Sequence, residues 1–100
     1  MILIERHDGR ACPFLYCDRC GEKIRDTGAA VAAWRAWGGL VSILHKGQCL
    51  AQFEREWCEE PWELCTEELD AHLYYLANNH GIKAERPPRF KGESWASRTC

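Results

Sequence analysis

Four residues of this chain have the types and the spacing of a metal site. Cys17 and Cys20 are separated by two residues in the stretch YCDRCGEKI, and His45 and Cys49 are separated by three residues in HKGQC. Three thiolates and one imidazole can complete the tetrahedral shell of a structural zinc ion. The pattern of Cys-x2-Cys, 24 residues and His-x3-Cys therefore predicts a zinc site at Cys17, Cys20, His45 and Cys49.

The same residues allow two other interpretations. A Cys-x-x-Cys pair can be a redox dithiol, although such a pair works best at the start of a helix, where the helix dipole lowers a thiol pKa. Here a glycine and charged residues follow Cys20 instead. The second alternative is that His45 and Cys49 simply pack in the core without a metal. Zinc bound by all four residues is the interpretation that we favour.

The residues before the first cysteine pair predict a hairpin that positions it. The stretches MILIER and ACPFLYC flank a turn at Asp8 and Gly9, and the second strand delivers the chain to Cys17. Pro13 marks this second strand as an edge or bulged strand, because proline cannot donate to a sheet ladder. Gly21 permits the tight knuckle that follows Cys20. The candidate inward-facing residues of the hairpin are Ile2, Ile4 and Leu15.

A second hairpin and two helices are predicted downstream. Strands near 30–37 and 40–45 flank Gly38-Gly39, and an alanine-rich helix over 29–36 is the alternative. A helix of about three turns is then predicted to end before Pro61. The signal is the helical spacing of its apolar residues Leu50, Phe53, Trp57 and Cys58. The second helix begins near Thr66 as N-cap, followed by acidic residues that suit its dipole. Its apolar stripe and its C-cap are Leu69, Leu73, Leu76 and Gly81.

The predicted order of elements resembles that of treble-clef zinc fingers. A knuckle, a β-hairpin and a helix whose first turn carries the last ligand cover about residues 15–58, and CDRCGE and HKGQC also resemble segments of small bacterial and phage proteins. The resemblance implies a small α+β domain in which zinc is structural. The second pair is His-x3-Cys, whereas the commonest pattern of the family is Cys-x2-Cys. His45 therefore stands before the helix rather than in it.

Length and composition indicate one small folded domain. One hundred residues, 46% of them apolar, predict a single zinc-stabilised domain over 1–82 and a basic, proline-containing, extended tail over 83–100. The chain shows no apolar run of roughly 18 residues and no export signal, so we expect a cytoplasmic protein. Seven cysteines in such a protein favour metal binding or redox chemistry over a disulfide framework. For Cys58 and Cys65, ordinary packing is expected over the alternative of a second site with His72 or His80. Cys12 is expected either to pack in its strand or to lie near the first site as a spare thiol.

The charge distribution bears on the class of partner. Residues 1–80 carry 8 basic and 13 acidic side chains, whereas residues 81–100 carry 5 basic and 2 acidic ones. The acidic stretch 53–70 and the five tryptophans favour a protein-interaction module, a small bacterial or phage regulator that docks on a larger protein. The alternative is a nucleic-acid-binding zinc finger. Its cations would be Arg19, Lys23 and Arg25 around the knuckle and Lys83, Arg86, Arg89 and Lys91 in the tail.

Two further expectations concern tryptophans and catalysis. Trp57 and Trp62 are expected in the core, while at least one of Trp34 and Trp37 is expected to be exposed, because residues three apart on a strand face opposite sides. The HExxH motif of zinc proteases and the His-x-Glu and Pro-Cys-x-x-Cys motifs of zinc deaminases are absent from the sequence. We therefore expect a protein that is not an enzyme.

Overall fold

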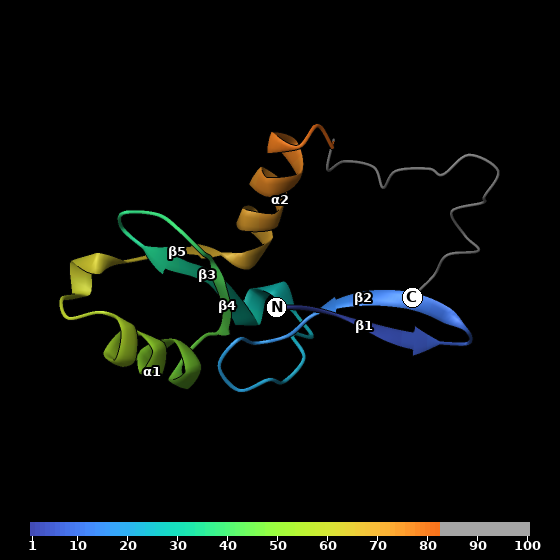
Figure 1. The fold of residues 1–100 in the computed structure, drawn as a ribbon, viewed down its shortest axis with the longest axis horizontal. Helices are drawn as coiled ribbons and strands as arrows, with labels where there is room; N and C mark the ends of the chain where they lie inside the picture. Colours follow the sequence, from blue (N-terminus) through green and yellow to red (C-terminus); the bar gives the residue numbers. More distant parts are fainter. Residues whose placement is uncertain (83–100) are drawn as a thin grey trace.

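The computed structural model describes residues 1–82, and these form a small α+β structure with two antiparallel sheets and two α-helices (Figure 1). The predicted tail, residues 83–100, lies outside the described residues. One sheet has two strands, β1 (Ile2–His7) and β2 (Arg10–Leu15). The other has three strands in the order β4 (Ser42–His45), β3 (Ala30–Arg35) and β5 (Leu64–Glu68). The helices are α1 (Gln48–Trp57) and α2 (Leu69–Asn79), and short 3-10 turns cover Thr27–Ala29 and Pro61–Glu63.

The N-terminal hairpin forms as predicted but does not bury its isoleucines. β1 pairs with β2 from Ile2 opposite Leu15 to His7 opposite Arg10. Ile2 and Ile4 are 68% and 59% exposed, so their predicted inward orientation is wrong. The physical reason is that the hairpin extends away from the three-stranded sheet (Figure 1), and the described part of the chain does not cover the face that carries them.

The central sheet is built on a strand of alanines. β3 pairs antiparallel with β4 on one side and with β5 on the other, and its first four residues, 30–33, are all buried. This strand excludes the alternative of an alanine-rich helix. α1 and α2 lie on opposite sides of the sheet (Figure 1). Small side chains on both faces of β3 leave room for a helix above and below it.

The chain between the helices is the main correction to the predicted fold. We placed the start of the second helix at Thr66, but residues 64–68 form β5 and α2 begins only at Leu69. β3 would otherwise present unpaired N–H and C=O groups along its second edge, and β5 satisfies them. α2 ends at Asn79 with His80 as its C-cap, one residue before the predicted Gly81. Gly81 follows the cap in a left-handed conformation with a φ of 81°, and the N–H of Ile82 donates to the carbonyl of Ala77.

One hydrophobic core lies between the central sheet and α1. It is formed by the buried residues Cys17, Val31, Ala33 and Leu44, against which Ile24, Cys49, Leu50, Phe53 and Leu64 pack. Trp57 and Trp62 are 53% and 71% exposed, so the prediction that they lie in the core is wrong. Trp57 stacks on Phe53 at the end of α1, with its ring centroid 6.0 Å away. Trp37 is 64% exposed in the loop between β3 and β4, in line with the prediction.

The close packing on β3 makes a testable prediction. Ala32 is completely buried between its neighbours, so replacing it with leucine (Ala32→Leu) is expected to lower the free energy of unfolding by about 1–3 kcal/mol through overpacking. Ala36→Leu is the matched control, because Ala36 is exposed in the loop after β3. Urea unfolding at a fixed metal concentration measures both variants, and equal losses would contradict the packing described for β3.

Candidate metal centre

The structure brings the four predicted ligands together. Cys17 and Cys20 lie in the turn after β2, His45 is the last residue of β4, and Cys49 is in the first turn of α1. Their sulfur and imidazole nitrogen atoms all lie within 4.8 Å of one another. Within residues 1–82, this is the one group of cysteine, histidine or acidic side chains with such an arrangement, and it could hold a metal ion.

The turn that carries the first two cysteines directs backbone N–H groups at their sulfurs. The N–H of Arg19 donates to Sγ of Cys17 at 3.4 Å, and the N–H of Glu22 donates to Sγ of Cys20 at 3.5 Å. Gly21 has a φ of 76°, a left-handed conformation that side chains disfavour, although nothing lies within 4 Å of the position a Cβ would take. Backbone conformation rather than space therefore requires glycine here. These N–H donors orient the sulfurs and stabilise their charged forms.

Asp18 fastens this turn to β4. Its carboxylate accepts the N–H of Ile43 at 2.6 Å, and its own N–H donates to the carbonyl of Ile43 at 2.8 Å. Ile43 lies two residues before His45, so the contact sets the turn beside the third ligand. Nδ1 of His45 lies 3.4 Å from Sγ of Cys20. The role of Asp18 is not predicted from the sequence, where its only signal is its position inside the CDRC motif.

The second ligand pair is positioned by the start of α1. Gly47 has a φ of 85° at the N-cap, and its carbonyl accepts the N–H of Ala51 at 2.9 Å. This left-handed conformation turns the chain from the end of β4 directly into the helix. As a result, the strand residue His45 and the helix residue Cys49 meet at the same point.

The electrostatics of the cluster favour a bound cation. Burial of Cys17 opposes its ionisation, but backbone N–H groups of Cys20, His45 and Arg19 outweigh that effect and lower the pKa of its thiol to about 6. Burial and the neighbouring sulfurs of Cys17 and Cys20 raise the pKa of Cys49 to about 11. The protein alone thus supports one thiolate readily and resists another beside it. A divalent cation would remove this repulsion.

Ion pairs tie the metal centre to the elements around it. The guanidinium of Arg19 donates to Glu56 at 2.6 Å and to Gln52 at 3.2 Å, which links the cysteine turn to α1. Lys23 forms an ion pair with Glu5 at 2.9 Å and lies 3.8 Å from the ring centroid of Phe14. Two of the three cations that we proposed around the knuckle therefore have acidic partners.

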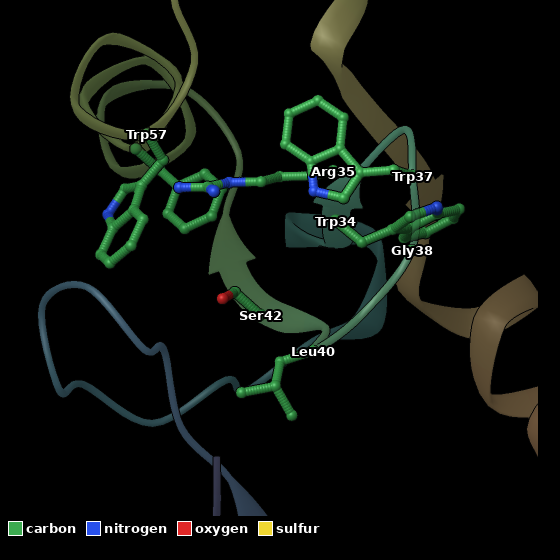
Figure 2. A pocket seen from close by; sticks show the side chains of 8 residues that line it. Trp34, Arg35, Trp37, Gly38, Leu40, Ser42 and Trp57 are labelled. Atoms are coloured by element: carbon green, nitrogen blue, oxygen red, sulfur yellow. The ribbon is translucent and has the colours of Figure 1, made fainter.

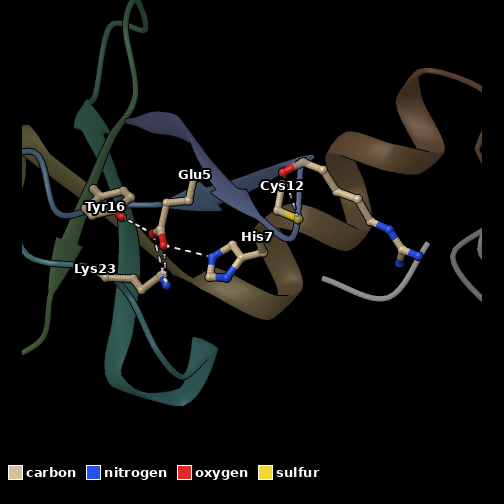
Figure 3. Close-up of polar contacts among 6 residues, drawn as sticks. Glu5, His7, Cys12, Tyr16 and Lys23 are labelled. Atoms are coloured by element: carbon tan, nitrogen blue, oxygen red, sulfur yellow. Dashed lines mark hydrogen bonds and ion pairs between the residues drawn. The ribbon is translucent and has the colours of Figure 1, made fainter. Parts of the chain in front are cut away.

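Glu5 joins the N-terminal hairpin to Tyr16 and Lys23, which flank the cysteine turn (Figure 3). Its carboxylate accepts hydrogen bonds from the hydroxyl of Tyr16 and from Lys23, and it also contacts Nε2 of His7 at 3.1 Å. Tyr16 and Lys23 face each other in an antiparallel bridge that flanks the cysteine turn. The hydrogen bonds from Tyr16 and Lys23 lower the pKa of Glu5 from 4.5 to about 2.

The remaining cysteines do not form a second site in the described part of the chain. Cys58 follows the end of α1, and Cys65 lies on β5 opposite Trp34. Burial and the nearby Glu63 raise the pKa of Cys58, which keeps it a neutral thiol. Cys12 is buried on β2 and stands outside the ligand cluster.

Comparisons with protein-family models, with curated proteins and with solved structures found no match to this chain. Among the described residues, neither α-helix has the length and apolar character needed to cross a membrane.

The contact between Asp18 and Ile43 yields a prediction for metal affinity. Asp18→Ala removes the acceptor that holds the cysteine turn on β4, so the affinity for metal is expected to fall about 10- to 100-fold. Asp18→Asn retains an oxygen acceptor and should recover most of the loss. Glu22→Ala is the matched control, since only its backbone contacts the site. Competition with a chromophoric zinc chelator measures all three, and an unchanged affinity in Asp18→Ala would disprove this role.

The Glu5 cluster predicts a pH dependence. Because the pKa of Glu5 is about 2 in the folded state and 4.5 without its partners, its stabilising effect is complete above pH 4.5 and disappears as the pH falls toward 2. Glu5→Gln should therefore increase amide hydrogen exchange in β1 at pH 6 relative to wild type. The difference between the two proteins should shrink below pH 4.5. A difference that stays constant between pH 6 and pH 3 would rule out the carboxylate as its source.

Proposed function

We propose that this chain is a zinc-stabilised, treble-clef-like protein-interaction module. The observation that carries the proposal is the four-residue cluster at the junction of the cysteine turn, β4 and α1. Three sulfurs and one imidazole form a soft donor set that suits zinc, and four such donors complete a tetrahedral shell. The order of knuckle, hairpin and helix agrees with the treble-clef resemblance in the sequence.

The ligand set supports a structural rather than a catalytic role for the metal. A catalytic zinc keeps one position for water or substrate, whereas here the protein supplies four ligands. Few large side chains are fully buried in the described residues, with Leu44 and Leu69 the largest. A structural zinc ion contributes roughly 10–16 kcal/mol of apparent binding free energy in small zinc-finger peptides, which compensates for such a limited core.

The exposed apolar residues support a protein as the partner. Trp37, Trp57 and Trp62 are more than half exposed, and Leu40 is 96% exposed. Trp57 and Trp62 belong to the acidic stretch 53–70, and acidic side chains repel nucleic-acid phosphates. Tryptophan is a frequent anchor of protein interfaces. The combination favours a protein partner with basic character.

The nucleic-acid alternative has less support. It relies on Arg19, Lys23 and Arg25 around the knuckle, but Arg19 is paired with Glu56 and Lys23 with Glu5. Its other cations belong to residues 83–100, outside the described part of the chain. No contact in the described residues favours this alternative over a protein partner.

The experiment that tests the metal is native mass spectrometry of the reduced full-length protein. We expect one zinc ion in the wild type, and weakened retention together with a lower unfolding midpoint in Cys17→Ser and His45→Ala. Cys58→Ser and His80→Ala are matched controls of the same types outside the cluster, and both should retain zinc. A wild-type protein that is folded and contains no metal would overturn the proposal.

The class of partner is tested by heparin chromatography of the same zinc-loaded protein. A protein-interaction module with paired knuckle cations is expected to flow through at moderate salt. Retention that falls steeply with salt and is lost in Arg19→Ser and Arg25→Ser would instead establish a nucleic-acid surface.

A further inference from the structure

An aromatic groove lies between the end of α1 and the loop that joins β3 to β4 (Figure 2). It encloses about 330 Å³. Its main lining residues are Trp34, Arg35, Trp37, Leu40, Phe53 and Trp57. Three tryptophans from three different segments therefore meet around one hollow on the surface, outside the metal centre.

Arg35 shows which chemistry the groove accepts. Its guanidinium carbon lies 5.3 Å from the ring centroid of Trp57 and 5.7 Å from that of Trp37. Figure 2 shows its side chain extending between these two rings. Both tryptophans are nevertheless more than half exposed, so their rings remain accessible to another molecule. Tryptophan faces attract cations, and they also stack on the flat ring of proline in extended peptides.

An acidic hollow adjoins the groove on the same helix. It encloses about 360 Å³, and its charged lining residues are Glu54, Glu59, Glu60 and Arg55. Phe53 and Trp57 of α1 line the groove, while their neighbours Glu54 and Cys58 line the hollow. The hollow lies at the C-terminal end of α1, where the helix dipole also favours a cation. Three glutamates against one arginine give the hollow a net negative charge, which is complementary to a basic ligand.

We propose that the groove and the acidic hollow together bind an extended segment of a partner protein that contains proline and arginine or lysine. The proline rings stack in the groove against Trp37 and Trp57, and the cation enters the hollow beside Glu59 and Glu60. This inference rests on the proposed function, because it specifies the partner chemistry of the same module. Aromatic grooves bind extended proline-rich segments in this way because these segments lose little entropy on binding.

The test uses a synthetic peptide with the sequence AERPPRFKG, which is that of residues 84–92 of this chain and combines two prolines with three cations. Isothermal titration calorimetry measures its binding to the zinc-loaded full-length protein. It is also measured on a full-length variant with Arg86→Ser and Arg89→Ser, so that the chain's own copy of the segment does not compete. A peptide with glutamate at its three cationic positions is the ligand control.

We expect Trp37→Ala to weaken the affinity at least about 10-fold, as for other buried interface anchors. The double variant Glu59→Gln, Glu60→Gln should weaken it about 5-fold and reduce its salt dependence. Trp62→Ala is the matched control, since Trp62 is exposed and does not line the groove, and it should bind as the wild type does.

Several outcomes would overturn the inference. These are failure of the peptide to bind either full-length protein, an equal loss in Trp62→Ala, or unchanged binding of the glutamate peptide. A single-stranded oligonucleotide that binds instead, with its affinity lost in Trp37→Ala, would assign the groove to nucleic acid. Native mass spectrometry of each variant separates the two proposals, because retained zinc without peptide binding contradicts only this inference.

Discussion

The convergence of three sulfurs and one imidazole on a single point is the constraint on which the rest of the structure depends. Cys17 is stabilised as a thiolate by the N–H groups around it, yet its charge opposes ionisation of Cys49. The protein alone thus stabilises one thiolate and keeps the neighbouring Cys49 protonated. The contacts of Asp18 with Ile43 and of Arg19 with Glu56 hold the cysteine turn to β4 and α1. A metal ion at this point would allow the sulfurs to ionise together, which is consistent with the proposed zinc site.

The same constraint fixes the position of α1, and the alanines of β3 make that position possible. α1 begins at the metal centre, because Cys49 lies in its first turn, and its apolar residues Leu50 and Phe53 cover one face of the sheet. α2 contacts β3 and β5, and Trp34 of β3 lies 5.9 Å from the ring of His72 of α2. With larger side chains on β3, the helices would be pushed outward. The direction of α1 therefore follows from its ligand at one end and its packing along the sheet.

Much of this arrangement could be predicted from the sequence, and the failures have physical causes. The ligand cluster and the pairing within the two hairpins were predictable because cysteine spacing and turn residues are local signals. The predicted tight turn at Gly38-Gly39 was wrong, since β3 ends at Arg35, β4 begins at Ser42 and residues 36–41 form a loop between them. The strand Leu64–Glu68 was not predictable, because acidic residues after Thr66 resemble a helix start, and only the free edge of β3 gives them a strand partner.

The exposure of Trp57 and Trp62 was missed for a related reason. Composition places tryptophan in the core, but α1 ends where the sheet no longer covers it. Asp18 went unrecognised since its partner Ile43 is 25 residues away.

The two ends of α1 have different roles, and the role of its C-terminal end depends on that of its N-terminal end. The N-terminal end carries a ligand of the metal centre, whereas the C-terminal end carries Trp57 and the glutamates of the acidic hollow. A helix of ten residues spans roughly 15 Å, too short to hold its direction without packing or ligation. With a metal ion bound as we propose, its removal would release the anchored end and with it the alignment of Trp57 with Trp37 across the groove. The reverse does not follow, since Trp37 lies on an exposed loop and contributes nothing to the ligand cluster. Under the two proposals, binding at the groove would therefore require the metal centre, while the metal centre would not require an intact groove.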